Sequence, residues 1–138
     1  MGLFSGKRPD GLGVRDGRLA LCPTSPNCVS SQADAADAEH HVAPLEFPPS
    51  ARGDPKAAWE ALERIVRSLE RTTLVTQRQG YLHAEVASAL LGFVDDLECL
   101  LDAAGRVIQV RSASRVGHSD LGVNRKRVER LRELLAQA

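Results

Sequence analysis

Four consecutive segments between residues 73 and 116 alternate apolar and polar side chains, and this alternation constrains the fold more than any other feature. A period of two is typical of β-strands that bury one face. The links between the segments are too short for crossovers, which makes neighbouring strands antiparallel. We predict strands at 73–78, 81–90, 93–102 and 107–116, with turns at 79–80, 91–92 and 103–106.

The last two predicted strands support this arrangement through their register. If residues 103–106 close the hairpin, Cys99 lies opposite Val110 and Glu98 lies opposite Arg111. Apolar side chains then meet on one face and an acid meets a base on the other. This is the pairing that stabilises antiparallel strands.

Two amphipathic helices are predicted to flank the strands. Residues 54–71 have Asp54 as a suitable N-cap, Pro55 at the first helical position and apolar residues at helical spacing. Residues 124–137 also place apolar side chains on one face and charged side chains on the other. The simplest architecture that buries both apolar stripes is an α+β fold. A single curved antiparallel sheet carries both helices on one face, in the order (β)αββββα.

The first part of the chain is irregular and holds most of the prolines. We interpret residues 1–53 as an extended N-terminal arm packed on the domain, with a short edge strand at 41–47. Residues 54–138 form the α+β core. The length of 138 residues is that of a single domain overall.

Composition narrows the classes of function. The chain has 18 basic and 18 acidic side chains, so its net charge is zero. Binding to nucleic acid would be favoured by a positive charge, and we therefore do not expect nucleic acid as a partner. No apolar run approaches the roughly 20 residues that span a bilayer, and the first residues lack the apolar stretch of a secretory signal. We therefore expect a cytoplasmic protein with no membrane span and no cofactor.

The sheet face opposite the predicted core collects ionisable side chains. By alternation these are His83, Glu85, Asp96, Glu98, Arg111 and Arg115. One interpretation is a solvated surface with cross-strand ion pairs, each worth under about 1 kcal/mol. A second is a concave site in which Arg111 and Arg115 bind an anionic or carbonyl group. A third is a protein interface, such as a homodimer formed through the sheet.

Two cysteines in the arm, Cys22 and Cys28, are close enough in sequence to form a disulfide that stiffens the arm. In a reducing cytoplasm the alternative is a pair of reduced structural thiols. Two thiols alone make a poor zinc site, which normally has four ligands, so no metal site is assigned. Cys99 alternates with core positions and is expected to be packing.

The run RSASRVGHSDLGVNRKR at residues 111–127 is the most polar part of the core. We expect Asp120 and Asn124 to cap the turn and helix, while Arg111, Arg115 and Arg125 reach acids of neighbouring strands. The loop also precedes a helix N-terminus, where amides and arginines attract anions. The candidate ligand-binding residues are therefore Arg111, Arg115, His83, Glu98, His118, Asp120, Asn124 and Arg125.

A catalytic arrangement would need a nucleophile with a partnered base. Cys28 or Ser30 could be the nucleophile and a histidine the base, but the sequence does not bring them together, and no catalytic residue is assigned. The neighbouring acids Asp95 and Asp96 point to opposite sheet faces and cannot act as one dyad. Asp95 is expected to accept hydrogen bonds from the backbone or from Ser114.

Three blocks of the sequence resemble the signatures of the DUF1499 family: CPTSPNCVSSQ at 22–32, YLHAEVASALLGFVDDLECLLD at 81–102 and RSASRVGHSDLGVNRKRVERLR at 111–132. They occur in the family's order and span nearly the whole chain. The resemblance implies an uncharacterised family with members in bacteria and plant plastids, many of which carry a leader or a membrane segment. It supplies no catalytic residues.

We therefore expect a non-catalytic module that binds a small anionic ligand or assembles with a protein partner. The polar sheet face and the corner at residues 115–125 would form its site. One alternative is a small hydrolase or transferase with a cysteine or serine nucleophile. Another is a structural domain that dimerises or binds proteins.

Overall fold

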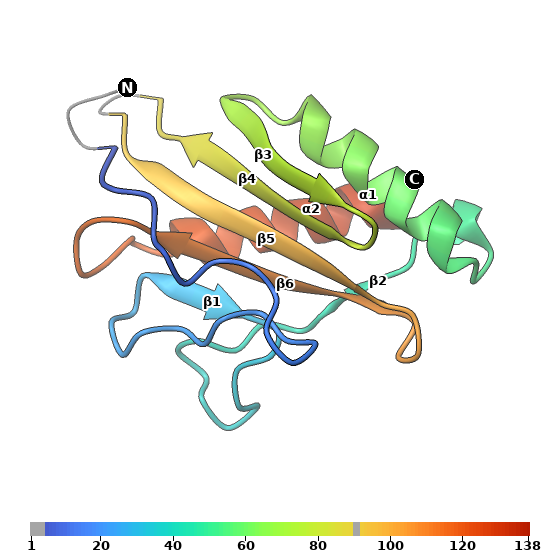
Figure 1. The fold of residues 1–138 in the computed structure, drawn as a ribbon, viewed down its shortest axis with the longest axis horizontal. Helices are drawn as coiled ribbons and strands as arrows, with labels where there is room; N and C mark the ends of the chain where they lie inside the picture. The colour runs from blue at the N-terminus through green and yellow to red at the C-terminus, as the bar shows by residue number, and fades with distance from the viewer. Residues whose placement is uncertain (1–4, 90–91) are drawn as a thin grey trace.

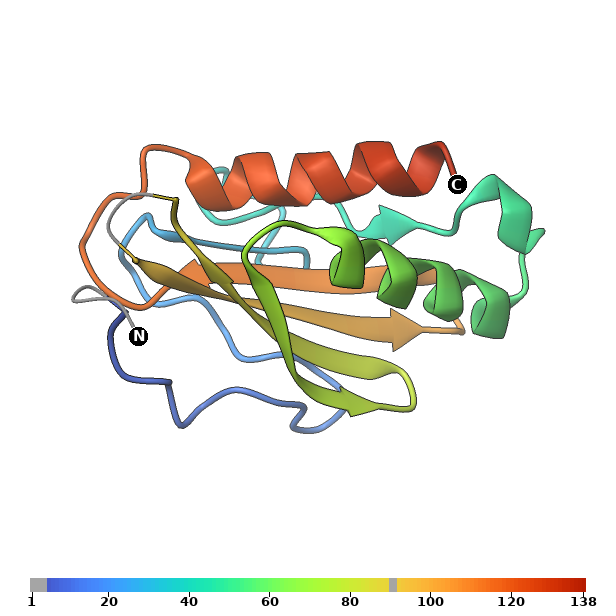
Figure 2. The same cartoon turned by 90° about the horizontal axis from the view of Figure 1, so that it is seen from above.

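The computed structural model describes residues 5–89 and 92–138. In this part of the chain an antiparallel sheet carries two helices on one face, as predicted (Figures 1 and 2). The elements in chain order are β1 (Cys28–Ser30), β2 (Leu45–Glu46), the 3-10 helix η1 (Pro49–Ala51), α1 (Pro55–Ser68), β3 (Thr72–Arg78), β4 (Tyr81–Ala87), β5 (Val94–Asp102), β6 (Val107–Ser114) and α2 (Val123–Ala136).

The strand order across the sheet is β1-β6-β5-β4-β3, and β2 pairs with β6 on the same edge as β1. The predicted hairpin register is confirmed, because Cys99 lies opposite Val110 and Glu98 lies opposite Arg111. One face of the sheet is therefore apolar and the other polar, as the alternation indicated.

The core lies between the apolar sheet face and the two helices. Helix α1 begins as predicted, with the Asp54 carboxylate accepting a hydrogen bond from the Lys56 amide and Pro55 at the first position. Its apolar side chains and those of α2 pack on alternating residues of β4, β5 and β6. The core comprises Val29, Val42, Leu45, Trp59, Leu62, Val66, Leu82, Ala84, Val86, Leu97, Cys99, Ile108, Val110, Val128, Leu131 and Leu135.

The N-terminal part contributes more to the sheet than the sequence predicted. Strand β1 was not predicted, and the strand expected at 41–47 is reduced to the two residues of β2. The strand predicted at 81–90 ends at Ala87, and Leu90 and the turn residue Leu91 lie outside the described residues.

Residues 5–21 cross the polar face of the sheet, on the side opposite the helices (Figure 2). We call this segment the strap. Of its side chains, only those of Ser5 and Leu19 are buried. Polar contacts rather than apolar packing therefore hold it on the sheet. Because the strap covers this face, the molecule has three layers: strap, sheet and helices.

Candidate functional site

The six ionisable side chains predicted on the outer sheet face lie between the sheet and the strap, and we call them the polar layer: His83, Glu85, Asp96, Glu98, Arg111 and Arg115. They are largely buried. The residues Glu98 and Asp96 are 0% and 1% exposed, and the Arg115 side chain is 2% exposed. A solvated sheet surface, the simplest of the three interpretations, is therefore not what the chain forms.

Arg115 is the centre of one half of the polar layer. Its guanidinium donates two hydrogen bonds of 2.8 Å to the Asp96 carboxylate and also binds Glu85. These contacts raise the pKa of Arg115. Burial opposes ionisation of Asp96, but hydrogen bonds from Arg115 and His83 outweigh it and lower the carboxyl pKa. Both groups therefore stay charged, and the guanidinium has its acceptors.

The strap completes this half of the layer. Arg8 from the strap lies 2.8 Å from the Glu85 carboxylate, which thus joins two guanidinium groups. Burial opposes ionisation of Glu85, but the arginines lower its pKa overall. His83 Nε2 lies 2.7 Å from the other carboxylate, that of Asp96.

Glu98 and Arg111 form the other half of the polar layer, and they face each other as predicted. Arg111 Nη1 lies 3.6 Å from Glu98 Oε1, and burial lowers the Arg111 pKa. Tyr81 donates a 2.6 Å hydrogen bond to the other Glu98 oxygen, which also accepts one of 2.8 Å from the Gly13 amide of the strap. Arg111 donates to the Leu21 carbonyl at 3.3 Å. Glu98 Oε1 and Arg111 Nε are the buried side-chain polar atoms without a hydrogen-bond partner in the described residues.

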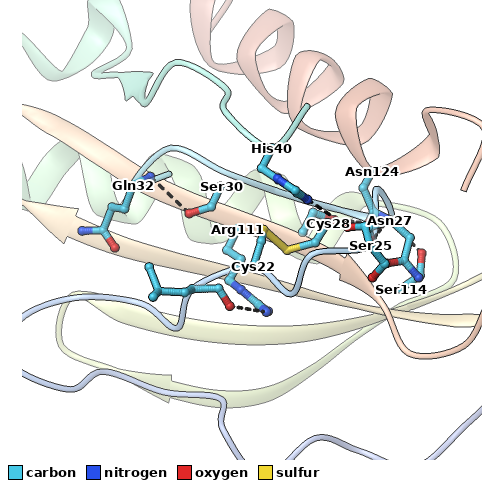
Figure 3. Close-up of a disulfide and its surroundings, with 12 residues drawn as sticks. Cys22, Ser25, Asn27, Cys28, Ser30, Gln32, His40, Arg111, Ser114 and Asn124 are labelled. Atoms are coloured by element: carbon cyan, nitrogen blue, oxygen red, sulfur yellow. Dashed lines mark hydrogen bonds between the residues drawn. A yellow bond between two sulfur atoms is a disulfide. The ribbon is translucent and has the colours of Figure 1, made fainter. Parts of the chain in front are cut away.

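A disulfide joins Cys22, at the end of the strap, to Cys28 in β1 (Figure 3). It lies on the outer face beside Arg111, because Cys28 pairs with Ala113 in the neighbouring strand β6. Of the alternatives considered for the two cysteines, the structure therefore has the disulfide. The sulfur of Cys28 is bonded and is not available as a thiolate nucleophile.

Asn124 is the centre of the corner at residues 115–125. It was predicted as a cap, but it lies inside the first turn of α2 and is fully buried. Its side-chain carbonyl accepts hydrogen bonds from Ser112 and Arg127, and its amide donates to Ser114. The N-cap residue is Gly122, and the carboxylate of Asp120, two residues earlier, accepts the backbone amides of Gly122 and Asn124. Burial disfavours the Asp120 anion, but these hydrogen bonds lower its pKa overall.

The first and third sequence blocks meet at this corner. The Asn27 side chain donates a 2.7 Å hydrogen bond to the Gly117 carbonyl, and the Asn27 carbonyl accepts hydrogen bonds from the amide of Ser114 and the side chain of Asn124. The polar residues of both blocks thus join the N-terminal segment to the strand-to-helix corner. Local sequence patterns do not indicate this contact, because the partner of Asn27 is 90 positions away.

Two predicted contacts at the corner are wrong. Arg125 does not reach acids of neighbouring strands; it donates to the carbonyls of Ala38, Glu39 and His41. Asp95 does point inward, but its carboxylate pairs with the Arg127 guanidinium at 2.8 Å rather than with Ser114. Both differences arise because α2 places its arginines next to partners that sequence alone could not locate.

His40 lies in the loop before β2 and is buried, although its immediate neighbours Ala38 and Glu39 are exposed. One ring nitrogen lies 2.9 Å from the Ser25 carbonyl and the other 2.7 Å from the Asp37 carboxylate. These two acceptors raise the His40 pKa. Asp37, Glu39 and His40 have potential metal-ligand atoms within 4.8 Å of one another. Both His40 nitrogens are already engaged by protein oxygens.

No nucleophile in the described residues is paired with a base by hydrogen bonding. The Ser30 hydroxyl accepts the Gln32 amide, and His83 is engaged by Asp96. His118 is exposed on the corner loop. The residues predicted for the site thus separate into two groups: those of the polar layer under the strap, and those of the corner, where Asn124 is buried and His118 is exposed.

Two grooves adjoin at the corner. The corner groove, of about 290 Å³, has a mainly apolar surface, to which Val94, Val116 and Leu121 contribute, and its lining also includes Asp95 and Asp120. The helix groove, of about 660 Å³, runs between the ends of α1 and α2. Its charged lining residues are Glu70, Arg71, Asp95, Lys126, Arg127 and Arg130. The two grooves share three lining residues, Ser88, Asp95 and Val123.

Comparison with known proteins identifies one family. Residues 18–135 match the model of a family described as "Protein of unknown function (DUF1499)". None of the curated proteins matches the chain. No solved structure matches it either. Neither helix in the described part of the chain has the length and apolar composition to span a bilayer.

Proposed function

The chain belongs to the DUF1499 family, whose function is unknown, and on that premise we propose that it is a non-catalytic binding module for a small anionic amphiphile. The ligand would occupy the corner at residues 115–125 and the two grooves beside it. The observation that carries this proposal is the junction of an apolar groove with a groove bordered by cations.

The separation of the predicted site residues into two groups supports the corner, and not the sheet face, as the place where a ligand binds. Arg111 and Arg115, expected to be the anion anchors, are buried under the strap, and Arg115 already binds two carboxylates. A solvated anion would have to displace the strap to reach them. We therefore assign the polar layer the role of fastening the N-terminal segment to the domain, and not that of a ligand site.

The cations of the helix groove have fewer carboxylate partners than Arg115 has. Its lining includes four basic side chains and two acidic ones. Arg127 is paired with Asp95 and Arg71 with Glu70, and Arg130 is in an exposed pair with Glu133. Lys126 has no carboxylate within salt-bridge distance among the described residues. An anionic head group over Lys126 and Arg130 would gain charge-assisted hydrogen bonds. An apolar tail could then lie in the adjoining corner groove.

Two features support a non-catalytic role over the alternative of a small hydrolase or transferase. The Cys28 sulfur is held in the disulfide. The Ser30 hydroxyl is buried and accepts a backbone amide instead of donating to an imidazole. Activation of either group as a nucleophile would require a base within hydrogen-bond reach.

The disulfide also bears on the compartment. From composition we expected a cytoplasmic protein, but structural disulfides persist mainly in oxidising compartments. The Cys28 end of this one is fully buried. We propose that the protein acts in an oxidising compartment.

Binding of octanoate tests the proposed ligand class, with octanol as its uncharged analogue. We expect octanoate to shift backbone amide resonances of Ser88 and Val123, where the grooves meet. Reversing two charges with Lys126→Glu and Arg130→Glu should weaken octanoate binding by about tenfold, or about 1.4 kcal/mol, and leave octanol binding unchanged.

A control pair on α1, Lys56→Glu with Arg64→Glu, changes the net charge equally on exposed positions away from the grooves. It should bind octanoate like the unmodified protein. If octanoate leaves the corner resonances in place, or if both charge-reversed proteins bind it equally, the proposal is wrong.

A further inference from the structure

We propose that the corner docks on an anionic lipid bilayer, with Leu121 inserted among the acyl chains and Lys126 and Arg130 at the phosphate level. This inference rests on the proposed function, because it identifies the anionic amphiphile as a membrane lipid. It concerns the outer surface of the corner rather than the grooves alone.

The corner presents an apolar tip to solvent. Leu121 is 87% exposed and Val123 is 44% exposed, and they are two of the exposed large apolar residues in the described part of the chain, with Val14 and Leu21. Single exposed apolar residues are common on soluble proteins and need no explanation. Here, however, the two residues are neighbours and adjoin the apolar corner groove.

The side chain of Leu121 is exposed even though its backbone has an unfavourable conformation. Its φ of 55° lies in the left-handed region, which residues other than glycine, asparagine and aspartate rarely adopt. The Ser119 hydroxyl accepts the Leu121 amide, and the Asp120 carboxylate accepts the amides of Gly122 and Asn124. A glycine at position 121 would adopt this conformation more easily, and the leucine packs on little within the protein. The exposed side chain is therefore better explained by an external contact than by folding.

Cations lie next to the tip on the first turns of α2. Lys126 and Arg130 are four residues apart, so they lie on the same side of the helix, about 6 Å apart along its axis. Both are exposed, and Arg130 forms an exposed pair with Glu133 at 3.4 Å. The groove that they line also contains two acids, Glu70 and Asp95, which are paired with Arg71 and Arg127. The nearby Asp120 carboxylate is engaged with backbone amides of the corner. An apolar tip followed by cations is the arrangement that interfacial lipid binding uses.

A bilayer fits this surface better than an acidic protein does. A stable protein interface buries on the order of 800 Å² on each partner. The corner instead offers one protruding side chain, a narrow apolar groove and two exposed cations, of which Lys126 has no carboxylate within salt-bridge distance among the described residues. The groove could hold part of an acyl chain, while each cation would be attracted to the anionic surface. We therefore expect weak, reversible and salt-sensitive binding.

Co-sedimentation of the oxidised full chain with vesicles tests the inference. The protein should bind vesicles of equal parts phosphatidylglycerol and phosphatidylcholine, and bind pure phosphatidylcholine at least tenfold more weakly. Leu121→Ser should lower binding to the anionic vesicles by about tenfold, because the variant loses the transfer free energy that a leucine side chain gains when it enters an apolar environment. Leu21→Ser, at a 77% exposed position on the strap, is the matched control and should bind like the unmodified protein.

The outcomes separate this inference from the proposed function. Octanoate binding without vesicle binding would overturn the membrane inference and leave the binding module intact. Vesicle binding without octanoate binding would support the inference and overturn the grooves as the ligand site. Equal binding by the Leu121→Ser and Leu21→Ser proteins, or equal binding to neutral vesicles, would show that the corner does not dock. Urea unfolding of each variant excludes a loss of fold, which is not expected at exposed positions.

Discussion

Replacing Asn124 with alanine should destabilise the protein far more than a polar residue in the first turn of a helix normally would. Asn124 is 0% exposed. Its side chain accepts from Ser112 at 2.7 Å and donates to Ser114 at 2.9 Å and to the Asn27 carbonyl at 3.3 Å. The alanine variant leaves these groups without that partner inside the protein.

The magnitude follows from which groups lose their partners. A buried polar group left without a hydrogen bond costs about 1–3 kcal/mol. The Ser112 hydroxyl proton and the Ser114 oxygen lose their acceptor and donor, whereas the Asn27 carbonyl keeps the amide of Ser114. Ser112 is fully buried and Ser114 is half-buried, so together they give a loss of about 3 kcal/mol in the free energy of unfolding. This is a large share of the 5–15 kcal/mol that is typical of a domain.

Urea unfolding at neutral pH measures this loss as a lower midpoint with an unchanged slope. Glu133→Ala, at an exposed position of the same helix, is the control and should change stability by less than about 0.5 kcal/mol. A loss below about 1 kcal/mol for Asn124→Ala would refute the reasoning, because it would mean that the serines readily find other partners.

Three further predictions concern the N-terminal segment. His40→Gln should remove a pH-dependent part of stability: the raised folded pKa of His40 stabilises the fold below about pH 6.5, and this is lost as pH rises through that pKa. The variant's melting temperature should thus approach that of the unmodified protein at high pH, and a constant gap would contradict this. Reduction of the Cys22–Cys28 disulfide, with a separation of 6 residues, should lower the free energy of unfolding by about 2 kcal/mol, visible as a lower urea midpoint. An unchanged midpoint would be inconsistent with a folding role. Gly6→Ala should speed hydrogen exchange of the strap, since an added Cβ lies 2.9 Å from Arg115 Cβ. Gly17→Ala has a similar positive φ but no neighbour within 4 Å, so its smaller effect isolates the contact.

The strands of the sheet could be predicted because their pattern is local. Alternation identified the buried face of β4, β5 and β6, and charge pairing fixed the register of Glu98 with Arg111. Strand β1 could not be found, because three residues are too few for a periodic pattern and its partner is more than eighty positions away. The helix ends were predicted within a few residues of their positions, as Asp54 illustrates.

The site was harder to predict, because alternation tells which face a side chain occupies and not what covers that face. The polar layer was correctly assembled from the sequence, but nothing indicated that Gly13 and Leu21 of the strap would supply its partners. Asp120 and Asn124 were both predicted as caps, but it is Asp120 that accepts backbone amides at the start of α2, whereas Asn124 lies inside the first turn. The local signal for this choice was the spacing of Asp120 ahead of the helix.

The strap reaches the polar layer mainly through its main chain. The Gly13 amide and the Leu21 carbonyl make its contacts with Glu98 and Arg111, and Arg8 is the side chain that reaches Glu85. Main-chain groups are the same in every amino acid except proline. Much of this segment can therefore change its side chains during evolution without losing its place, whereas the charged residues beneath it can change only together.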